Sequence, residues 1–243
     1  MSFPQTRKKS LLGPIIFVLA LLSVDAGISL ALVSNMVAFL HGYGKGPFKV
    51  NAEGAQDVIF LLAGHPQKLI TNQGHTTNGA GGTALVLVGL GGVIALLLER
   101  RARKHDGKSS PAFYIWAVIV VLSCLLSLAA FIYTFVETYI TDNQMIIVRV
   151  AQINPFPTRY PLDRWTPENW YAAVLGLSLV DVRDRNGITT NLRLMRGWRW
   201  NTIPLFLLGF ILAVLVVVEV IRSRRARREG EYRAPGEAPK AEF

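Results

Sequence analysis

Three histidines near one another in the sequence are the first residues whose chemistry would suit a metal site. His41, His65 and His75 are separated by 24 and 10 residues. Structural zinc sites hold their ligands in compact pairs, about two to five residues apart. Because these histidines form no such pair, the spacing predicts no metal site, and nothing else in the sequence indicates a cofactor.

Motifs for catalysis are also missing from the sequence. There is no HExxH, no GxSxG and no pair of cysteines. The glycine-rich segment at residues 41–47 lacks the preceding strand and the GKS/T ending of a phosphate-binding loop. Asp181 and Asp184 lie among arginines, which is more typical of a solvated surface than of a catalytic pair. We therefore do not predict an enzyme.

Asp25 is the ionisable residue nearest the middle of an apolar block. A charge at the centre of a bilayer costs at least about 2.5–3.5 kcal/mol, so such a residue suggests a function. We expect Asp25 to be protonated and hydrogen-bonded, with Ser123 and Ser127 as candidate partners at similar depth. A proton- or cation-linked role and a contact with a partner helix are the alternatives. A single acid without a mid-span proline argues against transport.

Four apolar blocks must position these residues. The chain has 243 residues, of which 17% are charged, whereas a soluble domain carries about 25%. Each block comes close to the roughly 20 apolar residues that cross a bilayer. The sequence predicts an all-α membrane protein, a four-transmembrane-helix bundle. The blocks are residues 11–40, 80–98, 112–138 and 203–221.

The first block also has some features of a signal peptide, with a basic start and small residues around Ala26. A cleaved signal has an apolar region of only about 7–15 residues. Here the apolar run continues for 14 residues beyond Ala26. We therefore expect an uncleaved signal-anchor helix.

The distribution of Lys and Arg predicts the orientation. Residues 1–10, 99–111 and 222–243 hold 15 of the 26 basic residues, whereas the longer segments 41–79 and 139–202 hold 11. Basic residues near span ends stay in the cytoplasm. Both termini and the short link are therefore expected to be cytoplasmic, and the two long loops extracytoplasmic. The net charge of +10 does not indicate nucleic-acid binding, because no nucleic-acid motif accompanies it.

The basic tail after the fourth block, residues 222–243, is a candidate site for anionic lipid headgroups, which attract such residues by about 1 kcal/mol each. A plain anchor that fixes orientation is the alternative. The tail is expected to be disordered, and its end has no apolar periodicity. The candidate headgroup residues are Arg222, Arg224, Arg225, Arg227 and Arg228.

Small residues recur on one face of each block and are expected to mediate helix packing, since lipid offers helices no hydrophobic drive to associate. An intramolecular bundle is the simpler interpretation. The alternative is that a glycine face, in particular that of the second block, meets another protein. The candidate packing residues are Gly27, Ala31, Gly82, Gly89, Gly92, Gly209 and Ala213.

The second long loop, residues 139–202, contains the start of a helix. Thr166 suits the N-cap, Pro167 suits the first helical position, and Trp165 and Trp170 have the spacing of a hydrophobic staple. After a turn expected at residues 186–187, an amphipathic segment carries Trp198 and Trp200. Either these tryptophan segments lie along the membrane surface and cap the bundle, or the first helix packs into a small outer domain.

Two shorter elements are expected in the loops. Residues 145–150 are rich in β-branched side chains and are consistent with a short strand. Residues 55–63 suggest a short apolar helix that pairs with the tryptophan-rich one.

The layout of four spans, inner termini and a substantial outer loop resembles the claudin-like and tetraspanin-like membrane organisers. The segment WTPENWYAAVL at residues 165–175 is also similar to predicted four-span membrane proteins of filamentous fungi. The outer-loop cysteines typical of claudins and tetraspanins are absent, because Cys124 is the only cysteine. No functional residue is carried over from these families.

We therefore expect a multi-pass protein that organises or binds other membrane components. Its expected partners are the lipid bilayer, with anionic lipids among them, and other membrane proteins or further copies of itself. A small transporter or channel that uses Asp25 is one alternative, and an accessory subunit of a membrane enzyme complex is another. The long first and third blocks favour a thick, plasma-type membrane.

Overall fold

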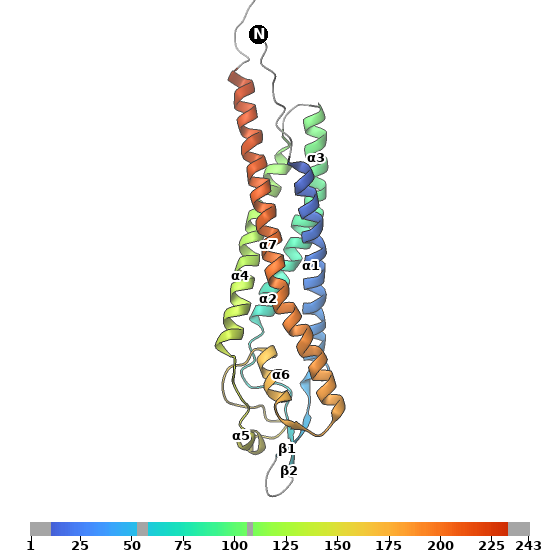
Figure 1. The fold of residues 1–243 in the computed structure, drawn as a ribbon, viewed down its shortest axis with the longest axis vertical. Coiled ribbons are helices and arrows are strands. Elements are labelled where there is room, and N and C mark those ends of the chain that lie inside the picture. The colour runs from blue at the N-terminus through green and yellow to red at the C-terminus, as the bar shows by residue number, and fades with distance from the viewer. Residues whose placement is uncertain (1–10, 53–57, 106–108, 233–243) are drawn as a thin grey trace, which may run out of the picture.

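Four long helices run side by side as an elongated bundle in the computed structural model, which describes residues 11–52, 58–105 and 109–232 (Figure 1). All four are long and apolar enough to cross a membrane. The second consists of three consecutive pieces, of which η2 is π-helical. The helices are α1 (Leu12–His41), the series α2 (Asn72–Gly82), η2 (Thr83–Leu90) and α3 (Gly91–His105), α4 (Pro111–Ile140) and α7 (Val182–Tyr232).

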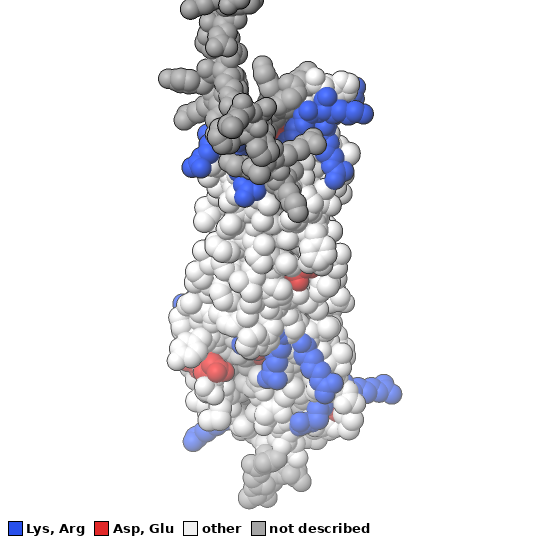
Figure 2. All heavy atoms as spheres, turned by 45° about the horizontal axis from the view of Figure 1, so that its top comes forward, with Lys and Arg blue, Asp and Glu red and all other residues white. Residues whose placement is uncertain are grey.

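The two ends of the bundle differ. At the end that we call the basic end, the start of α1 lies beside the C-terminal part of α7, and the backbone N–H of Leu11 donates to Glu219 Oε2 (3.3 Å). The end of α3 and the start of α4 lie at the same end (Figure 1). On the face shown in Figure 2, a broad band of the bundle carries no Lys or Arg, and basic side chains lie on either side of it.

The second and fourth helices extend well beyond the apolar blocks. The second begins at Asn72 rather than at residue 80, and α7 begins at Val182 rather than at residue 203. At its other end α7 continues to Tyr232, so the part of the tail that we expected to be disordered is helical up to there; residues 233–243 lie outside the described chain. Hydropathy marks the part of a helix suited to lipid, not the full length over which its backbone hydrogen bonds continue.

The π-helical turn of η2 exposes a backbone acceptor to a neighbouring helix. The indole N–H of Trp116, on α4, donates to the carbonyl oxygen of Val88 at 3.0 Å, and this bond is buried. Short π-helical stretches are rare, because they widen the helix and disturb its regular bonding. Here the hydrogen bond from Trp116 to Val88, within the apolar core of the bundle, compensates for the irregular bonding inside the helix.

A three-stranded antiparallel sheet lies beyond the other end of the bundle, in the order β2-β1-β3. Val50, at the centre of β1 (Phe48–Ala52), pairs with Phe60 of β2 (Val58–Leu62) and with Leu179 of β3 (Ser178–Leu179). The fold is therefore mainly helical rather than all-α. The helix expected at residues 55–63 is wrong at residues 58–62, where β-branched and aromatic side chains pair with β1; residues 55–57 lie outside the described chain.

The strand expected at residues 145–150 is also wrong, because helix α5 (Val148–Ile153) begins there. The outer edge of β2 is met by the segment after α5 instead, where the N–H of Phe156 donates to the carbonyl of Leu61 at 2.8 Å. A run of β-branched residues forms a strand only where a neighbour pairs with it, and this information is not local.

Helix α6 (Pro167–Leu175) begins where the capping residues indicate. The Thr166 hydroxyl accepts from the backbone N–H of Asn169 (3.3 Å), Pro167 occupies the first turn, and Glu168 follows it. The helix is short and mostly buried, and it lies between the ends of the long helices and the sheet (Figure 1).

The sheet, α5, α6 and the start of α7 share one apolar core, and we call this part the head (residues 42–71 and 141–198, as far as described). Its core also includes residues from the end of α1, so the head and the bundle are packed as one body. Members of this core are Met36 and Phe39 of α1, Val50 and Leu62 of the sheet, Trp165, Trp170 and Tyr171 around α6, and Ile188, Met195 and Trp198 of α7.

The amphipathic segment before the fourth apolar block is part of α7. The turn expected at residues 186–187 is helical, and Ile188, Met195 and Trp198 face the core of the head. The interpretation that this segment lies along the membrane surface is therefore wrong, because it continues into the helix suited to crossing the membrane.

Candidate functional site

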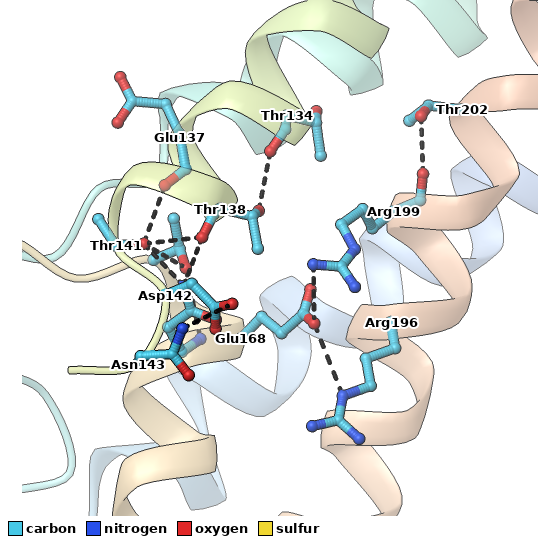
Figure 3. Close-up of polar contacts among 12 residues, drawn as sticks. Thr134, Glu137, Thr138, Thr141, Asp142, Asn143, Glu168, Arg196, Arg199 and Thr202 are labelled. Atoms are coloured by element: carbon cyan, nitrogen blue, oxygen red, sulfur yellow. Dashed lines mark hydrogen bonds and ion pairs between the residues drawn. The ribbon is translucent and has the colours of Figure 1, made fainter. Parts of the chain in front are cut away.

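A polar cluster joins α6 to α4 and α7 (Figure 3). The amide nitrogen of Asn169 donates to the Thr138 carbonyl (2.7 Å) and to the Thr141 hydroxyl (2.8 Å). Thr141 also lies 3.3 Å from the Thr166 hydroxyl. These bonds satisfy polar groups at the end of α4 that are buried beneath the head, so they fix the position of α6 on the bundle.

Glu168 connects the same helix to α7. Its Oε1 lies 3.3 Å from Arg199 Nη1 and 3.6 Å from Arg196 Nε, and Figure 3 shows both guanidinium groups reaching toward it. Burial raises the pKa of the Glu168 carboxyl, and the two arginines oppose this shift. A buried carboxylate between two guanidinium groups is suited to holding helices together.

The four tryptophans of the second loop have different surroundings. Trp165 and Trp170 are fully buried, with ring centroids 5.2 Å apart, and the indole N–H of Trp170 donates to the Gly64 carbonyl at 2.6 Å. Trp198 is also buried, whereas Trp200 is 56% exposed beside Phe135 and Arg199. The first three are therefore core residues of the head, and only Trp200 presents its ring at the surface.

Asp25 is not joined to its expected partners. Its Oδ2 is buried and has no hydrogen-bond partner among the described residues. The Ser127 hydroxyl donates instead to the carbonyl of Cys124 at 2.9 Å, and Ser123 is buried on the same helix. Ser29, one turn from Asp25 on α1, likewise has a buried hydroxyl oxygen without a partner in the described chain.

The glycines of the second helix are divided between packed and open positions. A Cβ at Gly89 would lie 2.8 Å from the Ser23 hydroxyl, and one at Gly92 would lie 2.8 Å from both Leu19 and Trp116. In contrast, a Cβ at Gly82 or at Gly27 would have no neighbour within 4 Å. The close approach of α1 and α4 to the second helix thus depends on Gly89 and Gly92.

On the other two helices with candidate packing residues, the contacts are looser. A Cβ at Gly209 of α7 would lie 3.6 Å from the Ser127 hydroxyl, which is an ordinary contact. Ala213, one turn further, is buried, whereas Ala31 of α1 is exposed. Gly209 and Ala213 therefore lie at the interface with the other helices, and Ala31 does not.

A buried ion-pair network, which we call the basic-end network, holds the four helices at the basic end. Arg103 of α3 contacts Glu99 (2.6 Å) and Glu219 of α7 (2.7 Å), and both carboxylates are buried. The other oxygen of Glu99 accepts from the backbone N–H of Ser110, the N-cap of α4, at 2.7 Å. With Leu11 on Glu219, all four helices meet in one network. The sequence offered one signal for it, the four-residue spacing of Glu99 and Arg103.

The arginines of the tail follow this network along α7. Arg222, Arg224 and Arg225 are exposed, and the Arg224 guanidinium lies 5.4 Å from the ring of Tyr114. The side chains of Arg227 and Arg228 lie outside the described part of the chain.

The three histidines, which sequence spacing did not connect, line one cavity of about 700 Å³ beside α1. His41 ends α1, His65 lies in the head and His75 lies on α2, and Arg159 adds a fourth basic side chain. In the described chain they do not form a group that could hold a metal ion. Asp25 lines neither this cavity nor the apolar one between α1 and the second helix.

Four membrane-length helices define the architecture of a multi-pass integral membrane protein. Comparison with protein-family models, curated proteins and solved structures finds no match to this chain.

Proposed function

We propose that the protein organises or binds other membrane components through its head. The observation that carries this proposal is an apolar patch on the outer face of β2, the end of α5 and the segment after it. Ile59 is 58% exposed and Ile153 is 73% exposed. Leu61 and Phe156 complete the apolar patch, and the hydrogen bond between their backbones puts the two segments side by side.

An exposed patch of this kind favours contact with another protein. Apolar side chains that gather outside the apolar band of a membrane protein gain stability when a neighbour covers them. The patch also adjoins β2, the edge strand of the sheet, whose backbone is partly open for pairing. The buried polar contacts of α6 with α4 and α7 hold the head in a fixed orientation. The patch is therefore presented to a partner without a prior disorder-to-order change of the head.

The proposal includes an orientation. Lys and Arg are denser in the segments at the basic end than in the head, which supports cytoplasmic termini and an extracytoplasmic head. The 30 residues of α1 and of α4 correspond to about 45 Å each, at about 1.5 Å per residue. This length favours the thicker plasma membrane over an endomembrane.

The two alternatives make different demands on the molecule. A transporter that uses Asp25 needs a polar path to that residue, and Asp25 lines neither of the cavities beside α1. An accessory subunit of a membrane enzyme complex would use the same apolar patch, with an enzyme as its partner. The identity of the captured partner therefore separates a subunit from an organiser.

The test is affinity capture of the tagged full-length protein from the cells that naturally make it, in a gentle detergent, with native mass and composition of the eluate. We expect stoichiometric partners, which are lost in Ile59→Ser and Phe156→Ser. Val182→Ser is the matched control, because Val182 is an exposed apolar residue that follows β3, at the opposite edge of the sheet.

A partner set that stays the same in both patch variants would contradict the proposed use of the head. A protein that elutes without partners would favour the alternative that it is a transporter. In that case Asp25→Asn should abolish flux without changing the native mass.

A further inference from the structure

The cavity beside α1 has an apolar wall and a basic rim. Val33, Met36 and Val37 of α1 line the wall. The rim carries the three histidines and Arg159, and none of the described lining residues is Asp or Glu. The rim residues are His41, His65, His75 and Arg159. Such a lining suits a molecule with an apolar part and an anionic part.

The position of the cavity along α1 corresponds to a membrane boundary. The basic-end network marks one boundary, because buried charges there are paired beside the exposed arginines of α7. A hydrocarbon core of roughly 30 Å takes about 20 helical residues. Counted from Leu11, which bonds to that network, the second boundary falls at about residue 31. The cavity begins at Val33 and is therefore at headgroup depth.

The electrostatics of the rim favour an anion. Burial lowers the pKa of His65, and Arg159, His41 and Lys45 lower it further. The bond to the backbone of Leu40 acts in the opposite direction and is the smallest effect. The same positive surroundings that disfavour a proton on His65 attract a negative group.

Two buried polar atoms at the cavity have no partner in the described chain. Gln73 is only 2% exposed, and its Oε1 accepts no hydrogen bond. His65 Nε2 is also buried without a partner. Buried polar groups are nearly always hydrogen-bonded. Gln73 Oε1 is an acceptor, and so is His65 Nε2 in a neutral ring whose other nitrogen donates to the Leu40 backbone. Both atoms therefore point to a bound group that carries a hydroxyl.

We propose that this cavity binds an anionic phospholipid of the leaflet next to the head. Its phosphate contacts Arg159 and the rim histidines His41 and His75, and an O–H group, on the headgroup or on the phosphate monoester itself, donates to Gln73 or His65. An acyl chain lies along Val33, Met36 and Val37. The site is distinct from the apolar patch, because no patch residue lines the cavity.

The test uses the full-length protein in a neutral detergent, with lipid binding measured by native mass spectrometry. The probes are dioctanoyl phosphatidic acid, dioctanoyl phosphatidylcholine and inorganic phosphate. We expect phosphatidic acid to bind at least tenfold more tightly than phosphatidylcholine. The double variant Arg159→Gln/His75→Gln should lose that preference; both side chains are exposed at the rim, so the fold should tolerate their replacement.

Two further variants keep the result specific. Arg149→Gln removes an exposed arginine of α5 outside the cavity lining and should leave affinity within twofold of the original. Val37→Ser alters the apolar wall and should lower the affinity for phosphatidic acid by at least threefold. Equal affinity for the two lipids, or an unchanged preference in the rim variant, would overturn the proposal. Inorganic phosphate that binds as tightly as phosphatidic acid would overturn the lipid assignment in favour of a free-anion site.

Discussion

At the residue scale, Trp170 makes the contact that best explains why a tryptophan-rich helix lies in the second loop. Its indole donates to Gly64 across the core of the head. In Trp170→Phe the ring remains but the Gly64 carbonyl loses its donor, which should lower the free energy of unfolding by about 1–3 kcal/mol. Thermal unfolding in detergent measures this.

Trp200→Phe is the control for that change, because Trp200 is exposed. Its unfolding temperature should remain close to that of the original protein. An equal loss in both variants would mean that the hydrogen bond to Gly64 contributes no specific stability.

Gly92 is the glycine whose replacement should be costliest for the bundle. A Cβ there would come within 2.8 Å of Leu19 and Trp116, so Gly92→Ala requires both helices to shift. Overpacking of this kind costs about 1–3 kcal/mol. The matched change Gly27→Ala meets no neighbour and should be neutral or stabilising, because alanine favours helix. Comparing the two unfolding temperatures checks this, and a Gly92→Ala protein as stable as Gly27→Ala would contradict the packing.

His65 should give the protein a stability that depends on pH. Its pKa in the folded chain lies below the ordinary value of 6.5, so the unfolded chain takes up a proton that the folded chain resists. Stability is therefore greatest above pH 6.5 and falls as the pH is lowered through that value. In His65→Gln this part of the fall should disappear. Unfolding curves at pH 7.5 and 5.5 measure it, and an identical fall in the variant would assign the effect to other groups.

Sequence reasoning reached local contacts but missed those made across the fold. Thr166, Pro167 and Glu168 were recognisable because caps act within one turn of helix. The pairing of Glu168 with Arg199 joins residues of different helices, and no spacing rule contains it. The same holds for the three histidines, which meet only because the head folds back on α1.

At the element scale, the basic-end network shows how three charged side chains on two helices hold the whole bundle. Arg103→Gln leaves Glu99 and Glu219 buried without their cation, and we expect a loss of about 3 kcal/mol. Adding Glu219→Gln should restore part of it, because one unpaired charge is removed. Unfolding of the single and double variants in detergent measures the coupling.

Arg101→Gln is the control, since Arg101 is exposed on the same helix. It should change stability by no more than about 0.5 kcal/mol. A double variant no more stable than Arg103→Gln alone would mean that Glu219 does not depend on Arg103.

Among the elements, α7 shows both the strength and the limit of hydropathy. The apolar run at residues 203–221 marked one membrane-length helix correctly. The polar turns before it belong to the same helix because the head covers their apolar face. A hydropathy window does not detect this face, because it averages the apolar residues with the polar ones between them. The strands were missed for a related reason, since β1 and β3 are more than 120 residues apart in the chain.

At the scale of the whole molecule, the proposed orientation can be tested by labelling single cysteines. In a Cys124→Ser background, Met145→Cys introduces an exposed thiol in the head, and Arg101→Cys introduces one at the basic end. A membrane-impermeant maleimide should label only the head cysteine in intact cells and both after permeabilisation. The reverse pattern would contradict an extracytoplasmic head. Cys124→Ser itself gives the unlabelled baseline.

The covalent path through the sheet has a mechanical consequence. β1 follows α1 and β3 precedes α7, and the two strands are paired, while Leu11 and Glu219 join the same two helices at the far end. Helices α1 and α7 are therefore joined to each other at both ends. Because of these two connections, a torque that a neighbouring protein exerts on the sheet cannot be relieved by separation of α1 from α7. We expect such a torque to pass along the helix pair to the basic end of the bundle.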